Sequence, residues 1–352
     1  MASAGEVDTV GMTVMGFHAS HEQIAPAELL RVVRRADEAG FGAAMCSDHF
    51  APWSARQGHS GFAWAWLGAA LATTRLGFGT VNAPGQRYHP AIIAQASATL
   101  AEMFPGRFWV ALGSGENTNE HITGDRWPGK AERDARLLEC VAIIRALHAG
   151  EEVTHRGLVT VDRARLWSLP AQPPLLIGPA VTIGTARSHA AWADGLVTTN
   201  QPLDTLRALI GAYRDAGGRG EVSVQVHLSW APTEAEALAI ALDQWRTNVF
   251  EPPVCWDLES PEHFDVVGAN VSAEQVRRTV MVSSDLGRVT QHLSALAELG
   301  VDRVYLHHVG QEQDSFIDAF GERVLPALDA GTAREAHVNA PPAPTAPGEA
   351  TA

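Results

Sequence analysis

The sequence predicts an eight-stranded parallel (β/α)8 barrel, or TIM barrel, of the α/β class with insertion segments. Eight short apolar runs each precede a helical stretch, and polar or ionisable residues gather where those runs end. The chain has 352 residues, 46% of them hydrophobic, which suffices for one large domain. Strand–helix alternation requires a parallel sheet, and eight repeats favour closure into a barrel. The predicted strands are Met12–Phe17, Gly42–Ser47, Leu76–Val81, Phe108–Gly113, Pro174–Gly178, Asp194–Thr199, Val222–Trp230 and Arg303–His308.

The helices between these strands are predicted from apolar spacing and from terminal proline and glycine. Pro26–Gly40 has proline at its start and glycine at its end. Glu151–Leu169 alternates apolar and polar residues around Arg156 and Gly157, which predicts a β-hairpin. The other predicted helices are Ala63–Thr73, Pro90–Phe104, Lys130–Ala149, Thr182–Ala193, Leu203–Ala216, Thr233–Thr247, Leu286–Leu299 and Asp314–Leu328.

Composition sets the expected domain boundaries. Residues 1–10 predict a flexible N-terminus, 11–330 a single barrel domain, and the Ala/Pro-rich residues 331–352 a disordered tail. The interval 248–272 is rich in Pro, Trp and acidic residues and has weak periodicity. An insertion of this length is interpreted either as a lid that controls the substrate or as a packed surface excursion.

Charge and hydropathy exclude several classes of partner. The formal net charge is −14, so nucleic acid and anionic membranes are poor partners. No apolar run approaches the roughly 18 residues of a membrane span, and the N-terminus lacks the pattern of a signal peptide. Three widely separated cysteines, Cys46, Cys140 and Cys255, indicate free thiols. We therefore expect a cytoplasmic protein that acts on a small molecule.

Two groups at strand ends are candidates for catalysis. His49, beside Asp48, would serve as a general base or acid because histidine titrates near neutrality. The alternative is that Asp48 caps a helix and His49 packs. Gly115 and Glu116 lie in a turn whose glycines let backbone approach a ligand, with an ordinary solvated turn as the alternative.

A metal site is a further alternative of a different class. His18, His21, Asp48 and His49 would together suit a metal-dependent hydrolase on the same barrel. His18 and His21 lie on a predicted loop, so their spacing carries little weight as evidence for a metal site. Of His307 and His308, the period-two geometry of a strand turns one into the barrel and the other towards the helices.

Several ordered motifs carry a resemblance to a known family. The segments are ASHEQ at 19–23, SDHF at 47–50 with Trp53, RYHPAIIAQ at 87–95 and GSGENTNE at 113–120. Together they resemble the coenzyme F420-dependent oxidoreductases of the bacterial luciferase-like superfamily, over about Val14 to Leu328. The nearest likeness is to the F420-dependent glucose-6-phosphate dehydrogenase group. The resemblance implies a luciferase-like barrel, usually a homodimer, with the deazaflavin F420 at the carboxyl ends of the strands.

The resemblance also implies a role for each matched residue. His49 would be the base for a substrate hydroxyl, tuned by Asp48, with hydride passing between the deazaflavin C5 and a hydroxyl or carbonyl carbon. Glu22 and Trp53 would line the reacting centre, and Glu116 would lie near the ring. A strand bulge at Thr80-Val81 would press on the back of the ring. The cofactor-binding residues would be Asp48, Thr80, Val81, Asn82, Gly115, Asn119, Gly178 and Thr199.

The departures from the family concern the substrate. Sugar-phosphate members bind the phosphate with two lysines and an arginine, where this chain has Gln201 or Pro202, Cys255 and Thr279. Recognition of a dianion needs charge-assisted donors, so we expect a substrate other than a sugar phosphate. The expected substrate pocket comprises Trp230, Cys255, Trp256 and Thr279. An FMN-dependent luciferase-like monooxygenase is the alternative within the superfamily.

Overall fold

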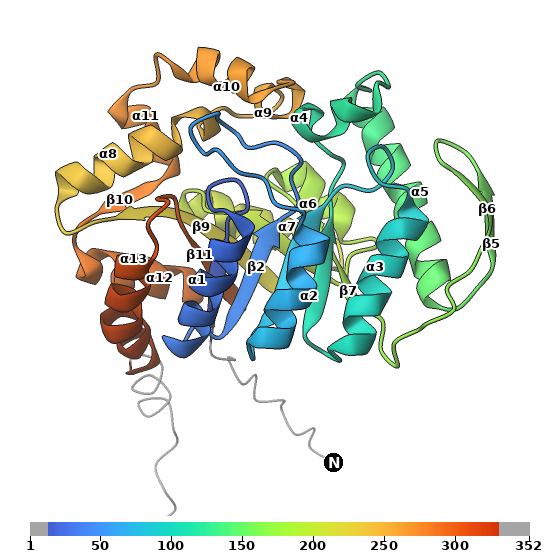
Figure 1. The fold of residues 1–352 in the computed structure, drawn as a ribbon, viewed down its shortest axis with the longest axis horizontal. Helices are drawn as coiled ribbons and strands as arrows, with labels where there is room; N and C mark the ends of the chain where they lie inside the picture. Colours follow the sequence, from blue (N-terminus) through green and yellow to red (C-terminus); the bar gives the residue numbers. More distant parts are fainter. Residues whose placement is uncertain (1–12, 331–352) are drawn as a thin grey trace, which may run out of the picture.

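A closed barrel of eight parallel strands forms the centre of the computed structural model, which describes residues 13–330 (Figure 1). Each strand pairs with the next barrel strand along the chain, and pairing of the last with the first closes the ring. All eight predicted strands are confirmed, whereas the predicted termini at 1–10 and 331–352 lie outside the described residues. The barrel strands are β1 Val14–Ala19, β2 Ala43–Ser47, β3 Gly77–Asn82, β4 Phe108–Leu112, β7 Leu175–Pro179, β8 Gly195–Thr199, β9 Val222–Trp230 and β11 Arg303–His308.

Helices surround the barrel, as the apolar spacing predicts (Figure 1). In α1, Pro26–Glu38, proline occupies the first turn and Leu29, Val32 and Ala36 are buried on one face. No helix among residues 13–330 has the length and apolar character needed to cross a membrane. The other predicted helices are confirmed as α2 Ala63–Thr73, α3 Pro90–Met103, α5 Lys130–His148, α6 Ile183–His189, α7 Leu203–Asp215, α8 Glu234–Gln244, α12 Leu286–Ala297 and α13 Asp314–Ala319, which a π-helical turn at Phe320–Val324 follows.

Two excursions leave the barrel. The predicted hairpin is confirmed as the antiparallel strands β5, Val153–Arg156, and β6, Thr160–Ala164. The insertion forms short helices at the end of the molecule where α4, Asn117–Glu120, also lies (Figure 1). Its elements are η2 Arg246–Asn248, α9 Val254–Asp257 and α10 Pro261–Gly268, followed by α11 Ala273–Thr279 and β10 Met281–Ser283, which pairs with the end of β9.

Strand alternation decides which side chains enter the barrel. Met45, Ala111, Ile177, Val197 and Tyr305 form the apolar interior. Residues between them pack outward against the helices. At the carboxyl ends of the strands, the inward positions are therefore His18, Val81, Gly113, Thr199, His227 and His307, and the outward positions are Asp48, Thr80, Asn82, Gly178, Trp230 and His308.

Candidate active site

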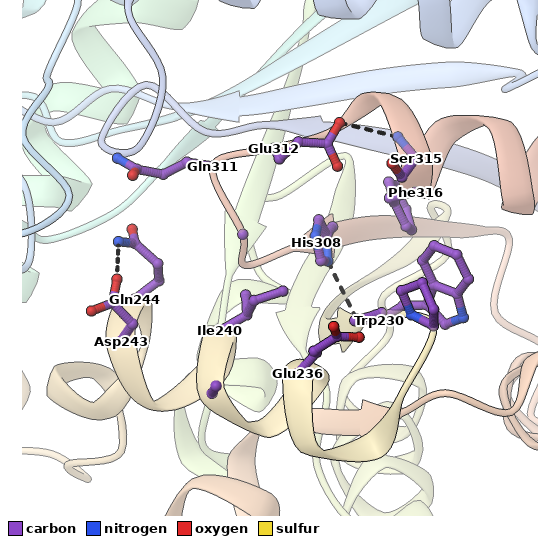
Figure 2. Close-up of a pocket in the computed structure, with 14 residues that line it drawn as sticks. Trp230, Glu236, Ile240, Asp243, Gln244, His308, Gln311, Glu312, Ser315 and Phe316 are labelled. Atoms are coloured by element: carbon purple, nitrogen blue, oxygen red, sulfur yellow. Dashed lines mark hydrogen bonds between the residues drawn. The ribbon is translucent and has the colours of Figure 1, made fainter.

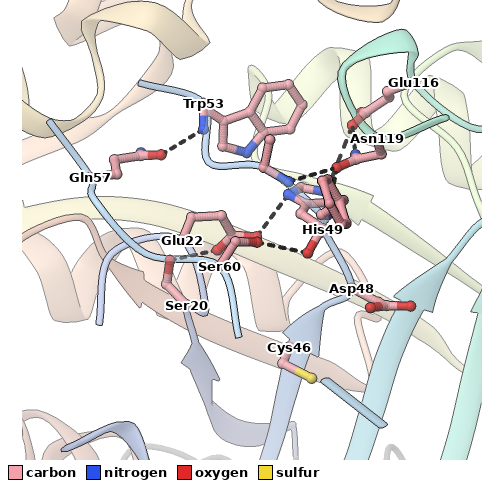
Figure 3. Close-up of polar contacts among 12 residues, drawn as sticks. Ser20, Glu22, Cys46, Asp48, His49, Trp53, Gln57, Ser60, Glu116 and Asn119 are labelled. Atoms are coloured by element: carbon pink, nitrogen blue, oxygen red, sulfur yellow. Dashed lines mark hydrogen bonds and ion pairs between the residues drawn. The ribbon is translucent and has the colours of Figure 1, made fainter. Parts of the chain in front are cut away.

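His49 lies between two carboxylates at the carboxyl end of the barrel (Figure 3). Its Nδ1 is 2.7 Å from Oε1 of Glu22, which follows β1. Its Nε2 is 3.7 Å from Oε2 of Glu116, which follows β4. Because parallel strands end at the same rim, residues from β1, β2 and β4 meet here despite their separation in the sequence. The structure thus brings three of the four predicted catalytic residues into direct proximity.

The two carboxylates differ in their electrostatics. Burial alone would raise the pKa of Glu22, but the adjacent His49, together with smaller effects of His18 and the Glu22 backbone N–H, outweighs burial and holds that pKa at about 2. Burial raises the pKa of Glu116, and the nearby carboxylates of Glu120 and Glu22 raise it further. Burial lowers the pKa of His49, yet Glu22 and Glu116 reverse this, so the pKa is raised above 6.5. Such a separation assigns Glu22 to the charged form and makes Glu116 the carboxyl that more readily holds a proton.

Trp53, the fourth predicted catalytic residue, forms a wall of the same site. Its indole meets the His49 ring edge-on at 5.0 Å and Phe264 of α10 at 5.2 Å. Its backbone N–H donates to Oε1 of Gln57 at 2.8 Å, which fixes the loop (Figure 3). The insertion therefore packs directly against a residue of the candidate site.

Asn119 and Gly115 shape the position of Glu116. The Asn119 amide donates to Oε2 of Glu116 at 3.3 Å and accepts from the Phe50 N–H at 2.8 Å, so it links the β4 and β2 loops. Gly115 has φ of +84°, and a Cβ there would lie 3.1 Å from the Glu120 side chain. The buried Asn119 amide thus positions Glu116, and its expected contact with a cofactor stays a prediction.

The structure corrects the expected role of Asp48. Its carboxylate points away from the His49 imidazole (Figure 3) and accepts from Trp64 Nε1 at 3.0 Å and Asn82 Nδ2 at 2.7 Å. The Tyr88 hydroxyl and the Arg87 guanidinium lie at 3.3 and 3.7 Å. The expectation that Asp48 tunes His49 is wrong because successive side chains of an extended chain point to opposite faces. Glu22 is the carboxylate that contacts the imidazole.

Two other expected cofactor residues, Thr80 and Gly178, also face outward from the barrel. Thr80 is fully buried beside Cys46, and β3 pairs in regular register through Thr80 and Val81, so the expected bulge is absent. Gly178 instead allows α6 to approach β7, since a Cβ there would lie 2.8 Å from His189. Val81 and Thr199 keep inward positions, as the expected cofactor role requires.

The expected substrate residues divide into separate places. Glu116 is a charged neighbour of Cys255 on α9, and the Asn117 side chain of α4 donates to the Asp257 carbonyl of α9 at 3.1 Å. Trp256 lies 5.4 Å from the Lys130 ammonium. Thr279 ends α11, and its backbone carbonyl accepts from Asn200 Nδ2 at 3.1 Å.

Trp230 does not join this group. It packs at 6.4 Å from Phe320 and lines a cavity of about 560 Å³ between α8 and α13 (Figure 2). His308 lines the same cavity and stacks on Phe316 at 5.0 Å, while the His307 ring lies 4.4 Å from His18 inside the barrel. The structure therefore confirms the opposite orientations of His307 and His308, and it corrects the placing of Trp230 in the substrate pocket.

The side chains of the metal alternative diverge. His21 packs edge-on against Trp66 at 4.9 Å, Asp48 faces Trp64, and His49 faces Glu22. Burial lowers the pKa of His18 to about 3 and that of His21 to about 4. Within residues 13–330, no cluster of three or more His, Cys, Asp or Glu side chains has an arrangement that would hold a metal ion. The geometry therefore gives the hydrolase hypothesis no support.

Two residues of the site were missed from the sequence. The Ser20 hydroxyl donates to Oε2 of Glu22 at 2.8 Å, and the Ser60 hydroxyl donates to the His49 carbonyl at 2.7 Å (Figure 3). Ser20 belongs to the ASHEQ motif and stands two residues before Glu22, a spacing that would have justified naming it. No pattern in the sequence connects Ser60 with His49.

The inward positions at the barrel mouth combine apolar surface with a few polar groups. Val81 contributes to the apolar interior below, and Gly113 leaves its inward position free of a side chain. His18 faces the interior with a buried Nδ1 that has no hydrogen-bond partner among the described residues. An apolar seat with a few convergent polar groups is typical of cofactor sites.

Comparison with known proteins adds evidence independent of this geometry. A family model of luciferase-like monooxygenases matches residues 9–303. An F420-dependent glucose-6-phosphate dehydrogenase of Nakamurella multipartita is 35% identical over 327 residues, covering 90% of this chain and 96% of that protein. A Beutenbergia cavernae protein of the same name is 33% identical over 335 residues, covering 91% and 98%. A solved F420-dependent secondary alcohol dehydrogenase, in complex with an F420-acetone adduct, has a TM-score of 0.83 at 28% identity, covering 90% of this chain and 99% of that chain.

Proposed function

This chain belongs to the luciferase-like monooxygenase family, and from that premise we propose that it is a coenzyme F420-dependent oxidoreductase of secondary alcohols or ketones. The observation that carries the proposal is the His49 imidazole held between the Glu22 and Glu116 carboxylates at the barrel mouth. The bound deazaflavin would supply the hydride chemistry at its C5, and the protein would supply orientation and proton transfer.

Each residue of the site would have its own part in proton transfer. In alcohol oxidation His49 would take the hydroxyl proton, and in ketone reduction it would return it. Glu22 would stabilise the imidazolium because its own low pKa keeps it charged. Trp53 would limit the space beside the imidazole and help to exclude water. Val81, Gly113 and Thr199 would hold the cofactor ring from the inward face of the barrel.

The charges around the site favour an uncharged substrate. Burial raises the pKa of Cys255 to about 12, and Glu116, Asp257 and Glu251 add to that rise. A phosphate dianion at this position would therefore face these carboxylates, and the nearest cations, Lys130 and Arg133, already pair with Asp134 and Asp257. Thr279 donates its hydroxyl to the Val276 carbonyl within α11 at 3.2 Å. The remaining candidates are also engaged: the Gln201 amide lies 3.4 Å from the Val181 carbonyl, and Arg278 pairs with Glu274 on the surface.

Cofactor choice is the first testable prediction. We expect F420 to bind with a Kd in the micromolar range or below, because the relatives of this chain are F420-dependent and its barrel mouth combines apolar inward positions with polar groups. Fluorescence titration of the full chain with F420 and, in parallel, with FMN measures both affinities. Micromolar binding of FMN without binding of F420 would instead support the monooxygenase hypothesis.

Substrate charge is the second prediction. We expect reduction of F420 by a small secondary alcohol such as propan-2-ol, with kcat/KM for glucose 6-phosphate lower by about 100-fold or more, because Cys255 and Thr279 offer no charged donor where sugar-phosphate members have cations. The rate of loss of F420 fluorescence with each substrate provides the comparison. Equal or greater kcat/KM for glucose 6-phosphate would contradict the uncharged substrate while leaving the cofactor assignment intact.

A further inference from the structure

We infer that Ser20 is a positioning residue that fixes the Glu22 carboxylate against His49. Three buried or nearly buried groups form a continuous chain: the Ser20 hydroxyl, the Glu22 carboxylate and the His49 imidazole (Figure 3). The serine hydroxyl donates to Oε2 at 2.8 Å, which leaves Oε1 directed at Nδ1 of His49 at 2.7 Å. One carboxylate oxygen is thus held by the serine and the other meets the imidazole.

The carboxylate needs this hydroxyl for a physical reason. Glu22 is only 3% exposed, so its charged form has lost water and depends on protein donors. A hydroxyl donor stabilises the charged carboxylate and restricts rotation of its terminal torsion, which is otherwise broad. Without Ser20, Glu22 would gain proton affinity and orientational freedom. Both changes weaken its contact with His49, whose burial then acts against the protonated imidazole.

The other charged groups around His49 cannot replace this contact. Glu116 is more distant, at 3.7 Å, and its own pKa is raised. Arg87 opposes protonation of His49. His18 and His21 also oppose it where they carry charge, but burial keeps both neutral near pH 7. The groups that face His49 are Glu22 after β1, Arg87 after β3, Glu116 after β4, and the two histidines His18 and His21 of the β1 segment.

The test measures the His49 pKa by NMR titration of the full, cofactor-free chain with 15N-labelled histidine, the signal being assigned by its loss in His49→Ala. Ser20→Ala is expected to lower this pKa by about one unit. Ser60→Ala is the matched control, because it removes a hydroxyl that bonds to the His49 backbone and not to Glu22. It should leave the pKa unchanged. Ser20→Thr, which retains the hydroxyl, should keep the His49 pKa close to its native value.

A double substitution sharpens the result. In a Glu22→Gln background, Ser20→Ala should cause no further change, because the two residues act through one contact. Equal pKa values in Ser20→Ala and the native chain, or additive shifts in the double variant, would overturn the inference. If circular dichroism shows that Ser20→Ala does not fold, Ser20→Cys keeps the size with a weaker donor, and an intermediate fall is expected. An unchanged pKa in Ser20→Cys would then count against the inference.

The catalytic consequence rests on the proposed function, whereas the NMR measurement does not. If F420 is the cofactor, the pH dependence of kcat should move in Ser20→Ala by the same amount and direction as the His49 pKa, while KM for the alcohol changes little. A chain that fails to bind F420 but shows the predicted NMR shift would remove the proposed function and leave the role of Ser20 standing. If Ser20→Ala raised KM without shifting the pH profile, Ser20 would have only a structural role.

Discussion

Replacement of His49 with alanine is expected to lower kcat by roughly 10²- to 10⁴-fold while the Kd for F420 stays within about threefold. The imidazole is the group placed to exchange the substrate proton, since its Nδ1 is held by Glu22 at 2.7 Å and its Nε2 faces Glu116 across 3.7 Å. Single-turnover absorbance of F420 and a fluorescence titration separate the two effects. An unchanged kcat would remove His49 from the mechanism.

His155 offers a matched control for this substitution. It also contacts a carboxylate, Glu139, at 2.9 Å, but it lies on the β5–β6 hairpin outside the barrel. His155→Ala is expected to leave kcat unchanged. A comparable loss in both variants would attribute the effect to histidine removal in general rather than to the site.

The direction of the pH dependence follows from the raised pKa of His49. Alcohol oxidation needs the neutral imidazole as base, so its rate should rise with pH through a pKa above 6.5. Ketone reduction needs the protonated form, so its rate should fall over the same interval. Because Glu22 raises this pKa, Glu22→Gln should move both profiles to lower pH.

Replacement of Asp48 with alanine is expected to destabilise the fold by about 3–5 kcal/mol, a loss typical of breaking a buried ion pair. The Asp48 side chain is fully buried, and the Arg87 guanidinium beside it is 7% exposed. Removal of the carboxylate would leave Arg87 with one carboxylate, Glu120 at 3.6 Å, beside its bond to the backbone carbonyl of residue 48, and would orphan the donors of Trp64 and Asn82. Urea denaturation followed by circular dichroism measures the change.

Asp204→Ala is the control for Asp48→Ala. Asp204 also pairs with an arginine, Arg207, but its side chain is 95% exposed, and no measurable loss of stability is expected. The two roles considered for Asp48 give opposite outcomes. If Asp48→Ala folds with native stability and loses F420 affinity, the residue acts at the cofactor as the family resemblance implies, and the structural role is wrong.

The fold was predictable because its signals are local. Each barrel strand is a short run of apolar and β-branched residues, and each helix has an apolar stripe with recognisable ends. The short helices α10 and α11 were missed, although their start signals are readable. Ser260 caps α10 with Pro261 in its first turn, and Ser272 forms a capping box with Gln275.

The sequence predicted which residues form the site better than it predicted which of them contact each other. Family motifs supplied His49, Glu22, Glu116 and Trp53, which the structure brings together. The partner of His49 was mistaken because Asp48 is adjacent in sequence, and adjacency in an extended chain means opposite faces. The contact with Glu22 arises because β1 and β2 pair in parallel and end side by side, which spacing along the chain does not encode.

The same alternation of side chains along a strand explains why Trp230 was wrongly placed in the substrate pocket. His227 enters the barrel and contacts the His307 ring at 5.4 Å. Trp230 lies an odd number of residues further along the same strand and therefore turns outward to Phe320. Strand alternation does not predict the direction of residues beyond the strand ends, such as Cys255 and Trp256 on α9, because their positions depend on how the insertion packs.

Transfer of deuterium from the carbinol carbon of a labelled secondary alcohol would show whether hydride passes directly to F420. Native enzyme and F420 are mixed with propan-2-ol that carries deuterium at its second carbon, and the reduced cofactor is examined by NMR and mass spectrometry. Direct transfer would place one deuterium at C5 of the deazaflavin, together with a primary isotope effect if hydride transfer limits the rate. Reduced cofactor that carries only solvent hydrogen at C5 would contradict direct hydride transfer and with it the proposed function.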